Sequence, residues 1–64
     1  MEIGKKIRYL RKEKGIYQYQ LAKASNVSEL TIIRIENNQV QPNPATLICI
    51  ADALGVSVEE LRGE

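Results

Sequence analysis

Hydrophobic residues recur along this chain at the spacing of α-helices. Near the N-terminus, Ile3, Ile7 and Leu10 are separated by four and three positions, so they share one face of a helix. Gly15 is the expected C′ residue of that helix, because glycine readily adopts the left-handed conformation that often ends a helix. The pattern therefore predicts a first helix over about residues 2–14.

A second and a third helix are predicted close together and joined by a tight turn. The second covers about residues 18–25, and the third follows Ser28, a good helix cap, and reaches about Asn37. Asn26 and Asn38 stand where the backbone needs a positive φ, which asparagine tolerates better than most residues. The two helices face each other through their apolar positions, Leu21, Ala22, Val27, Ile32 and Ile35. The third helix is therefore expected to hold its polar side outward.

Two further helices are predicted in the second half. Asn43 is the expected cap of the fourth, Pro44 takes its first position without losing a hydrogen bond, and Gly55 ends it. Ser57 and Glu60 have the spacing of a capping box at the start of the fifth helix. Five short helices without a strand pattern predict a compact all-α fold.

Length and composition narrow the class of protein. Sixty-four residues suffice for one domain with one small core, so residues 1–64 are predicted to form a single domain. The chain has no apolar run of about 18 residues, and its N-terminus lacks the long apolar region that is typical of a signal peptide, so no membrane partner is expected. The one cysteine, Cys49, is expected to be half-buried on the fourth helix, and a single cysteine fits a reducing cytoplasm.

The residue types argue against an enzyme. The chain has no histidine, no cluster of metal-ligand residues and no glycine-rich phosphate loop. Five helices this short also leave little room for a pocket of several hundred Å³. We therefore expect no cofactor, no metal and no small-molecule substrate.

The charges are divided unevenly between the two halves. The net charge is only +1, but residues 1–34 carry eight basic and three acidic side chains, whereas residues 35–64 carry one basic and five acidic. A basic half can present a positive face to phosphates even when the whole chain is nearly neutral. Ordinary solvated lysines explain the same pattern, and charge alone leaves both interpretations open.

The chain resembles the phage-repressor/Cro-like (XRE-like) helix-turn-helix family. The resemblance rests on four segments in family order and spacing: IGKKIRYLRKEKG, QYQLA, NVSELTIIRIENN and LICIADALGVSVEEL. It implies a five-helix lambda-repressor-like DNA-binding domain with the helix-turn-helix at the second and third helices. It also implies a transcriptional regulator, expected to be a repressor, that binds double-stranded DNA as a homodimer on a palindromic operator. The fifth helix is the expected dimer contact, through Val58, Leu61 and Arg62.

The resemblance also implies DNA-binding roles for matched positions. Gln18 matches a glutamine that contacts the DNA backbone and braces the third helix, and Asn37 matches a backbone-contacting residue after that helix. Arg11 and Glu36 match a structural ion pair. The positions that match the groove-facing side of the third helix are Ser28, Glu29, Leu30, Thr31 and Arg34.

Side-chain chemistry indicates what the groove-facing residues would contact. A carboxylate only accepts hydrogen bonds, so Glu29 suits the cytosine amino group, although an acid in a first helical turn also fits the helix dipole. Leu30 suits a thymine methyl group, and Thr31 suits either kind of contact. Arg34 is expected to bind a phosphate rather than guanine, because N-terminal residues of a recognition helix reach the bases.

The chain departs from the family pattern near the second helix. Tyr17 replaces the usual serine, threonine or asparagine cap, so a cap is expected to be lost, and its hydroxyl is free to reach a phosphate. Tyr19 replaces a usual acid. The two tyrosines either form an aromatic rim around Gln18 or pack as ordinary surface side chains. The loop 39–41 lacks the basic residues of many relatives, which predicts a shallower salt dependence of DNA binding.

An alternative use of the same fold is a protein-interaction module, such as an antitoxin or an anti-repressor partner. Leu30, Ile33 and Val40 would then form an apolar patch together with the tyrosines. Fold by itself does not distinguish this alternative from DNA binding.

Overall fold

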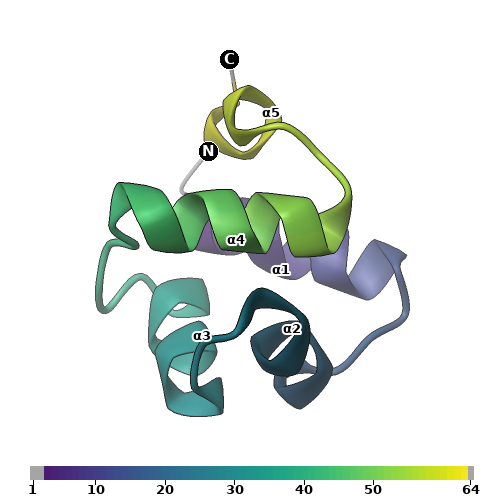
Figure 1. The fold of residues 1–64 in the computed structure, drawn as a ribbon, viewed down its shortest axis with the longest axis vertical. Helices are drawn as coiled ribbons and strands as arrows, with labels where there is room; N and C mark the ends of the chain where they lie inside the picture. Colours follow the sequence, from purple (N-terminus) through teal and green to yellow (C-terminus); the bar gives the residue numbers. More distant parts are fainter. Residues whose placement is uncertain (1–2, 64) are drawn as a thin grey trace.

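The computed structural model describes residues 3–63 and contains five helices (Figure 1). They are α1 (Ile3–Glu13), α2 (Gln18–Ser25), α3 (Glu29–Glu36), α4 (Pro44–Leu54) and α5 (Val58–Arg62). Residues 3–63 include no strand, and the predicted all-α fold is confirmed. The first helix was predicted to begin near Glu2, which lies outside the described residues.

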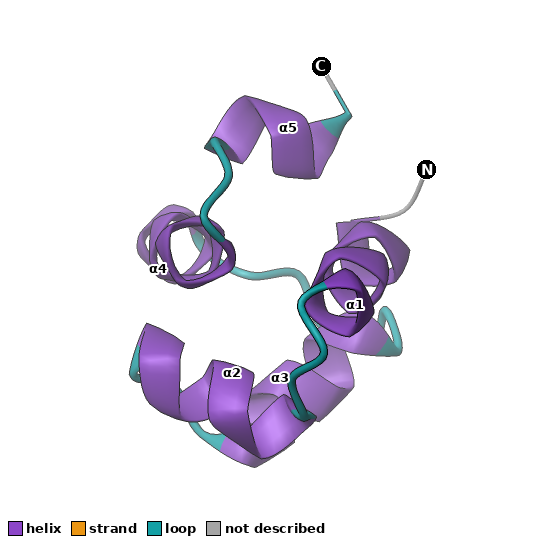
Figure 2. Ribbon diagram, turned by 90° about the vertical axis from the view of Figure 1, so that its right-hand side faces the viewer, coloured by secondary structure: helices purple, strands orange, loops and turns teal. Residues whose placement is uncertain are grey.

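The helices are arranged around one core in a molecule of about 27 × 23 × 19 Å. α2 and α3 lie side by side at one end, α1 and α4 form the middle, and α5 lies at the opposite end (Figures 1 and 2). α2 packs against α3 and α4, while α1 packs against α3 and α5. The outer surfaces of α2 and α3 therefore form one end of the molecule.

The core is aliphatic, as the composition predicts. Its buried members are Ile7, Leu21, Ala22, Ile32, Ile35, Leu47, Ile50, Ala51, Leu54 and Leu61. All three tyrosines are exposed, so no aromatic ring contributes to the core. No helix within residues 3–63 has the length and apolar character needed to cross a membrane.

Two predictions about buried residues are wrong. Leu61 was expected at a dimer contact, but it is only 1% exposed and packs in the core. Cys49 was expected to be half-buried, but it is exposed. Its neighbour Ile48 is 52% exposed. The helical stripe that α4 buries passes through Leu47, Ile50, Ala51 and Leu54, and leaves positions 48 and 49 facing solvent.

The predicted caps and turns are confirmed. Each cap side chain accepts a hydrogen bond from the amide three residues later: Ser28 from Thr31 at 3.1 Å, Asn43 from Thr46 at 2.8 Å, and Ser57 from Glu60 at 3.0 Å. Asn26 and Asn38 have φ values of 61° and 59°. These local signals set where α3 begins and ends.

A close approach between α1 and the end of α3 was not predicted. A Cβ atom on Gly4 would lie 2.3 Å from the backbone oxygen of Ile35, so only glycine fits there. The Gly4 amide also donates a hydrogen bond to Oδ1 of Asn38 at 3.3 Å. The start of α1 is thereby fastened to the C-terminal end of α3.

Candidate nucleic-acid interface

The structure places the predicted site residues at the α2–α3 end of the molecule, and none of them lies in the core. Gln18 and Thr31 are half-buried. The other six are exposed: Tyr17, Ser28, Glu29, Leu30, Arg34 and Asn37. The exposed fraction of Leu30 is 52%, so this side chain is not buried against α2 and is accessible to a partner. Ile33 is half-buried.

The first turn of α3 is ordered by two hydroxyl groups. Besides accepting from the Thr31 amide, Oγ of Ser28 lies 2.7 Å from Oγ1 of Thr31, within hydrogen-bond distance. This pair uses part of the hydrogen-bonding capacity of both hydroxyls. Glu29 and Leu30 lie beside the pair with exposed side chains. They are the best-placed residues of this turn for contacts outside the molecule.

A buried carboxylate joins α1, α2 and α3. Glu36 is 1% exposed and accepts hydrogen bonds from Nε and Nη2 of Arg11, at 2.7 and 3.1 Å. It also accepts from Nε2 of Gln18 at 3.0 Å and from Nε of Arg8 at 3.5 Å. The implied Arg11–Glu36 ion pair is confirmed, and it is the centre of a larger cluster.

The cluster keeps Glu36 ionised. Burial by itself raises the pKa of the Glu36 carboxyl, but hydrogen bonds from Arg11 and Gln18, together with the Arg11 charge, lower the pKa by more. The pKa therefore lies below its ordinary value. At neutral pH the ionised carboxylate therefore links α3 to both α1 and α2.

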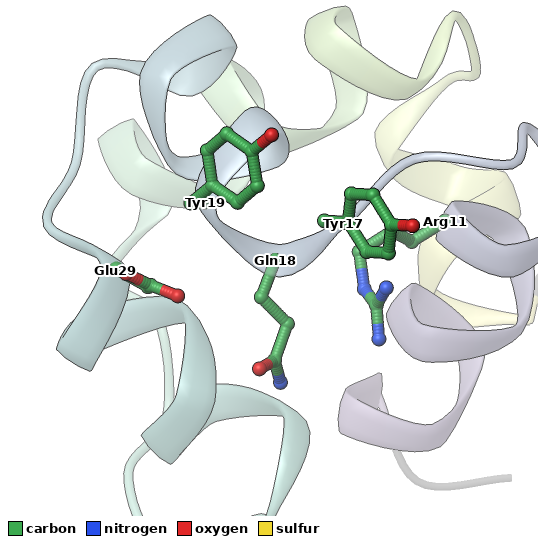
Figure 3. A pocket seen from close by; sticks show the side chains of 5 residues that line it. All are labelled: Arg11, Tyr17, Gln18, Tyr19 and Glu29. Atoms are coloured by element: carbon green, nitrogen blue, oxygen red, sulfur yellow. The ribbon is translucent and has the colours of Figure 1, made fainter.

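The cluster also determines how Gln18 presents its amide. A carboxylate can only accept, so the Gln18 atom that faces Glu36 must be the nitrogen. The amide oxygen then faces the side on which Glu29 lies, as Figure 3 shows. One remaining N–H can donate to a phosphate, and the oxygen can accept from a base amino group.

A shallow hollow of about 330 Å³ lies in front of this glutamine (Figure 3). It is lined by Arg11, Tyr17, Gln18, Tyr19 and Glu29. The rings of Tyr17 and Tyr19 are stacked, with centroids 5.8 Å apart and an interplanar angle of 11°. Of the two interpretations left open by the sequence, the structure supports the aromatic rim.

The loss of the α2 cap is only partly compensated. The Tyr17 side chain makes no cap hydrogen bond, as predicted. However, Oε1 of Gln20 accepts from the Tyr17 amide at 2.7 Å, which is one half of a capping box. Sequence reasoning missed Gln20, although a glutamine three residues after the cap position is a known signal.

Arg8 is a second residue that the sequence did not single out. Its Nη2 donates to Oδ1 of Asn37 at 2.7 Å, besides the longer contact with Glu36. Arg8 lies one helical turn before Arg11 on α1, which was an available signal. Residues 3–63 hold no group of histidine, cysteine or acidic side chains suited to a metal ion.

Comparison with known proteins identifies the family. The helix-turn-helix family model matches residues 7–61, which is most of the chain. The chain belongs to the helix-turn-helix family. The resemblance inferred from the four sequence segments is therefore confirmed.

Relatives of this helix-turn-helix protein are regulators. The chain is 38% identical over its full length to the immunity repressor protein of Bacillus phage phi105. It is 39% identical over 95% of its length to the competence pilus inhibition repressor of Acinetobacter baylyi, and 36% identical over 95% to the transcriptional activator BcrR of Enterococcus faecalis. The chain spans only 44%, 56% and 30% of the lengths of these proteins.

Solved structures confirm the fold. The solution structure of the DNA-binding domain of the P22 c2 repressor matches with a TM-score of 0.94 and 32% identity, over 97% of this chain and 82% of that one. The crystal structure of the P22 c2 repressor with a synthetic operator matches with a TM-score of 0.91 and 33% identity, over 95% of this chain and 92% of that one. The helix-turn-helix protein therefore has the fold of a phage-repressor DNA-binding domain.

Proposed function

We propose that this helix-turn-helix protein is a sequence-specific regulator of transcription, acting as a repressor, that inserts α3 into the major groove of double-stranded DNA. The observation that carries the proposal is the close structural match to a repressor solved with its operator. The exposed polar side of α3 and its attachment through Glu36 support the same conclusion. Residues 1–64 would act as one DNA-binding domain in the cytoplasm.

The proposal assigns base contacts to the start of α3. Glu29 accepts a hydrogen bond from a cytosine amino group, because a carboxylate beside a purine would face the N7 acceptor. Leu30 packs on a thymine methyl group, and Thr31 supports either contact. Ser28 holds the first turn in place through the Thr31 amide and hydroxyl. Sequence preference would therefore be concentrated in this turn.

Contacts with the phosphates surround the base contacts. Arg34 contacts a phosphate from the last turn of α3. Three further side chains contact phosphates: Gln18 through its remaining N–H, Tyr17 through its hydroxyl group, and Asn37 through its amide. These contacts fix the register of the protein on DNA and carry no sequence information themselves.

We further propose that two copies bind together on a palindromic operator. A small domain gains affinity and specificity when a symmetric pair contacts two half-sites. The half-sites would then be separated by one helical turn, about 34 Å. Leu61 takes no part in the contact between the copies, because it is buried in the core.

Selection from a pool of random duplexes tests the proposal as a whole. We expect enrichment of one palindromic sequence with half-sites one turn apart. Binding to the selected duplex should weaken as salt increases, because phosphate contacts release counterions. Failure to enrich any sequence, or binding that is indifferent to salt, would contradict DNA recognition.

Replacement of Glu29 by alanine tests direct readout. We expect the selected sequence to lose its preference at one position in each half-site, with discrimination falling by about 1–3 kcal/mol there. Glu13→Ala is the matched control, because it removes an exposed carboxylate at the end of α1. An unchanged preference at every position for Glu29→Ala would mean that this carboxylate does not read a base.

The exposed apolar side chains favour one competing function, a protein-interaction module. Leu30 and Val40 are 52% and 43% exposed, and both rim tyrosines are more than half exposed. This function predicts a stoichiometric complex with a partner protein that survives high salt, without any retardation of duplex DNA at low salt. Retardation of the selected duplex in a gel-shift experiment would support the transcriptional regulator and contradict the protein-interaction module.

A further inference from the structure

The C-terminal end of α3 carries a surplus positive charge. Glu36 is paired with Arg11 at 2.7 Å, so one carboxylate and one guanidinium largely cancel. Arg8 approaches the same carboxylate only at 3.5 Å, and its side chain is 40% exposed. The exposed charge in this cluster is therefore that of Arg8. The Arg8 charge lies at the C-terminal end of α3, where the helix dipole by itself would repel an anion.

Arg8 retains donors that are not used inside the protein. Its Nε faces Glu36, and one N–H of Nη2 is donated to Asn37. A guanidinium has more N–H donors than these two contacts use, and they lie in one plane that suits a phosphate. The half-exposed side chain leaves these donors accessible to a ligand.

Arg8 also fixes the orientation of the Asn37 amide. Arginine can only donate, so the Asn37 atom that lies 2.7 Å from Nη2 must be the amide oxygen. The amide nitrogen is then turned away from Arg8 with its hydrogens free of that contact. A phosphate can only accept, so this orientation is the one that binds a phosphate.

We propose that Arg8 and Asn37 together form one phosphate-binding site at the C-terminal end of α3, in which Arg8 both contacts the phosphate and orients the Asn37 amide. The site rests on the proposed function, since the phosphate belongs to the DNA backbone beside the recognition helix. The close packing of Gly4 against the end of α3 holds the two residues in register. Sequence reasoning assigned a role to Asn37 and none to Arg8.

Affinity for the selected duplex tests the site with Arg8→Met, Asn37→Ala and the double variant. We expect each single variant to bind about tenfold more weakly. The double variant should be little weaker than the weaker single variant, because the two residues serve one phosphate. Arg8→Met should also reduce the slope of log affinity against log salt by about one. Fully additive losses would overturn the proposal.

Lys14→Met is the matched control for charge. Lys14 is exposed, and its ammonium group lies near Gly55 at the end of α4 rather than near α3. We expect the affinity of Lys14→Met for the selected duplex to differ from that of the wild type by less than about threefold. Equal effects of Arg8→Met and Lys14→Met would mean that Arg8 acts only through net charge, which would overturn the site.

Neutral phosphates provide a readout that does not depend on how stable the variants are. Methylphosphonate is substituted at one phosphate of the duplex at a time. Wild-type protein should lose affinity at one position where Arg8→Met loses nothing further and Asn37→Ala, which keeps the Arg8 contact, loses less than the wild type. The absence of such a position would overturn the site while leaving the proposed function intact, whereas a wild-type protein that binds no duplex would overturn both.

Discussion

At the scale of single residues, the most consequential side chain is Glu36. It is buried, ionised, and hydrogen-bonded by side chains from α1 and α2. Removing a carboxylate from water costs free energy, and the hydrogen bonds and the positive charge of its partners offset that cost. Loss of one partner therefore leaves part of the cost uncompensated. The same carboxylate sets the orientation of Gln18 at the proposed interface. One residue thus supports stability and the geometry of binding.

Replacement of Glu36 by glutamine should destabilise the protein by about 3–5 kcal/mol, because Arg11 is left buried without its counter-charge. Equilibrium unfolding in urea measures the effect. Glu13→Gln, which changes an exposed carboxylate, should alter the free energy of unfolding by less than about 0.5 kcal/mol. A loss of under about 1 kcal/mol for Glu36→Gln would show that the ion pair contributes little.

At the scale of elements, the weak point is the start of α2. α3, α4 and α5 each begin with a side-chain cap, whereas Tyr17 offers none and only Gln20 compensates. A tyrosine at this position carries a cost in helix stability relative to a capping residue. The stacked rings of Tyr17 and Tyr19 border the hollow in front of Gln18, which supports a role for the tyrosine in binding.

Tyr17→Ser should therefore raise the free energy of unfolding by about 0.5–1 kcal/mol, because serine caps α2 and completes the capping box with Gln20. It should also weaken binding to the selected duplex. Tyr9→Ser is the control, because it removes an exposed tyrosine within α1 where no cap is needed. If Tyr17→Ser is no more stable than the wild type, the missing cap is not a real deficit.

At the scale of the whole molecule, the free energy of unfolding should vary with pH in the acid range because Glu36 titrates there. Its pKa is lowered in the folded protein, so this group stabilises the fold at a pH above its unfolded value. That contribution is lost as the pH falls from about 4.5 through the lowered pKa of the folded state. Wild-type protein should therefore lose stability more steeply than Glu36→Gln over this window. Parallel pH profiles of thermal unfolding for the two proteins would contradict the prediction.

The whole fold was predictable because its signals are local. Helix ends depend on nearby residues such as Ser28, Asn43 and Gly55, and the apolar spacing shows which faces are buried. The prediction for Cys49 was wrong because Ile48 and Cys49 extend the apolar run of α4 but lie off the stripe that this helix buries.

The candidate site was predictable only in part. The exposed positions of α3 follow from the helical repeat and the family resemblance. The contact between Arg8 and Asn37 joins residues 29 positions apart. The position of Arg8 one turn before Arg11 places it on the side of α1 that faces α3, but it does not indicate Asn37 as the partner. The close approach of Gly4 to Ile35 is likewise a product of how two helices cross.

The sequence by itself determined the five helices, their caps, the aliphatic core and the family, because hydrogen bonds and apolar spacing within a segment specify them. Only the tertiary structure decided which atoms of Gln18 and Asn37 face outward. Those orientations depend on Glu36 and Arg8, and chain folding alone brings such donors and acceptors from separate helices within hydrogen-bond distance.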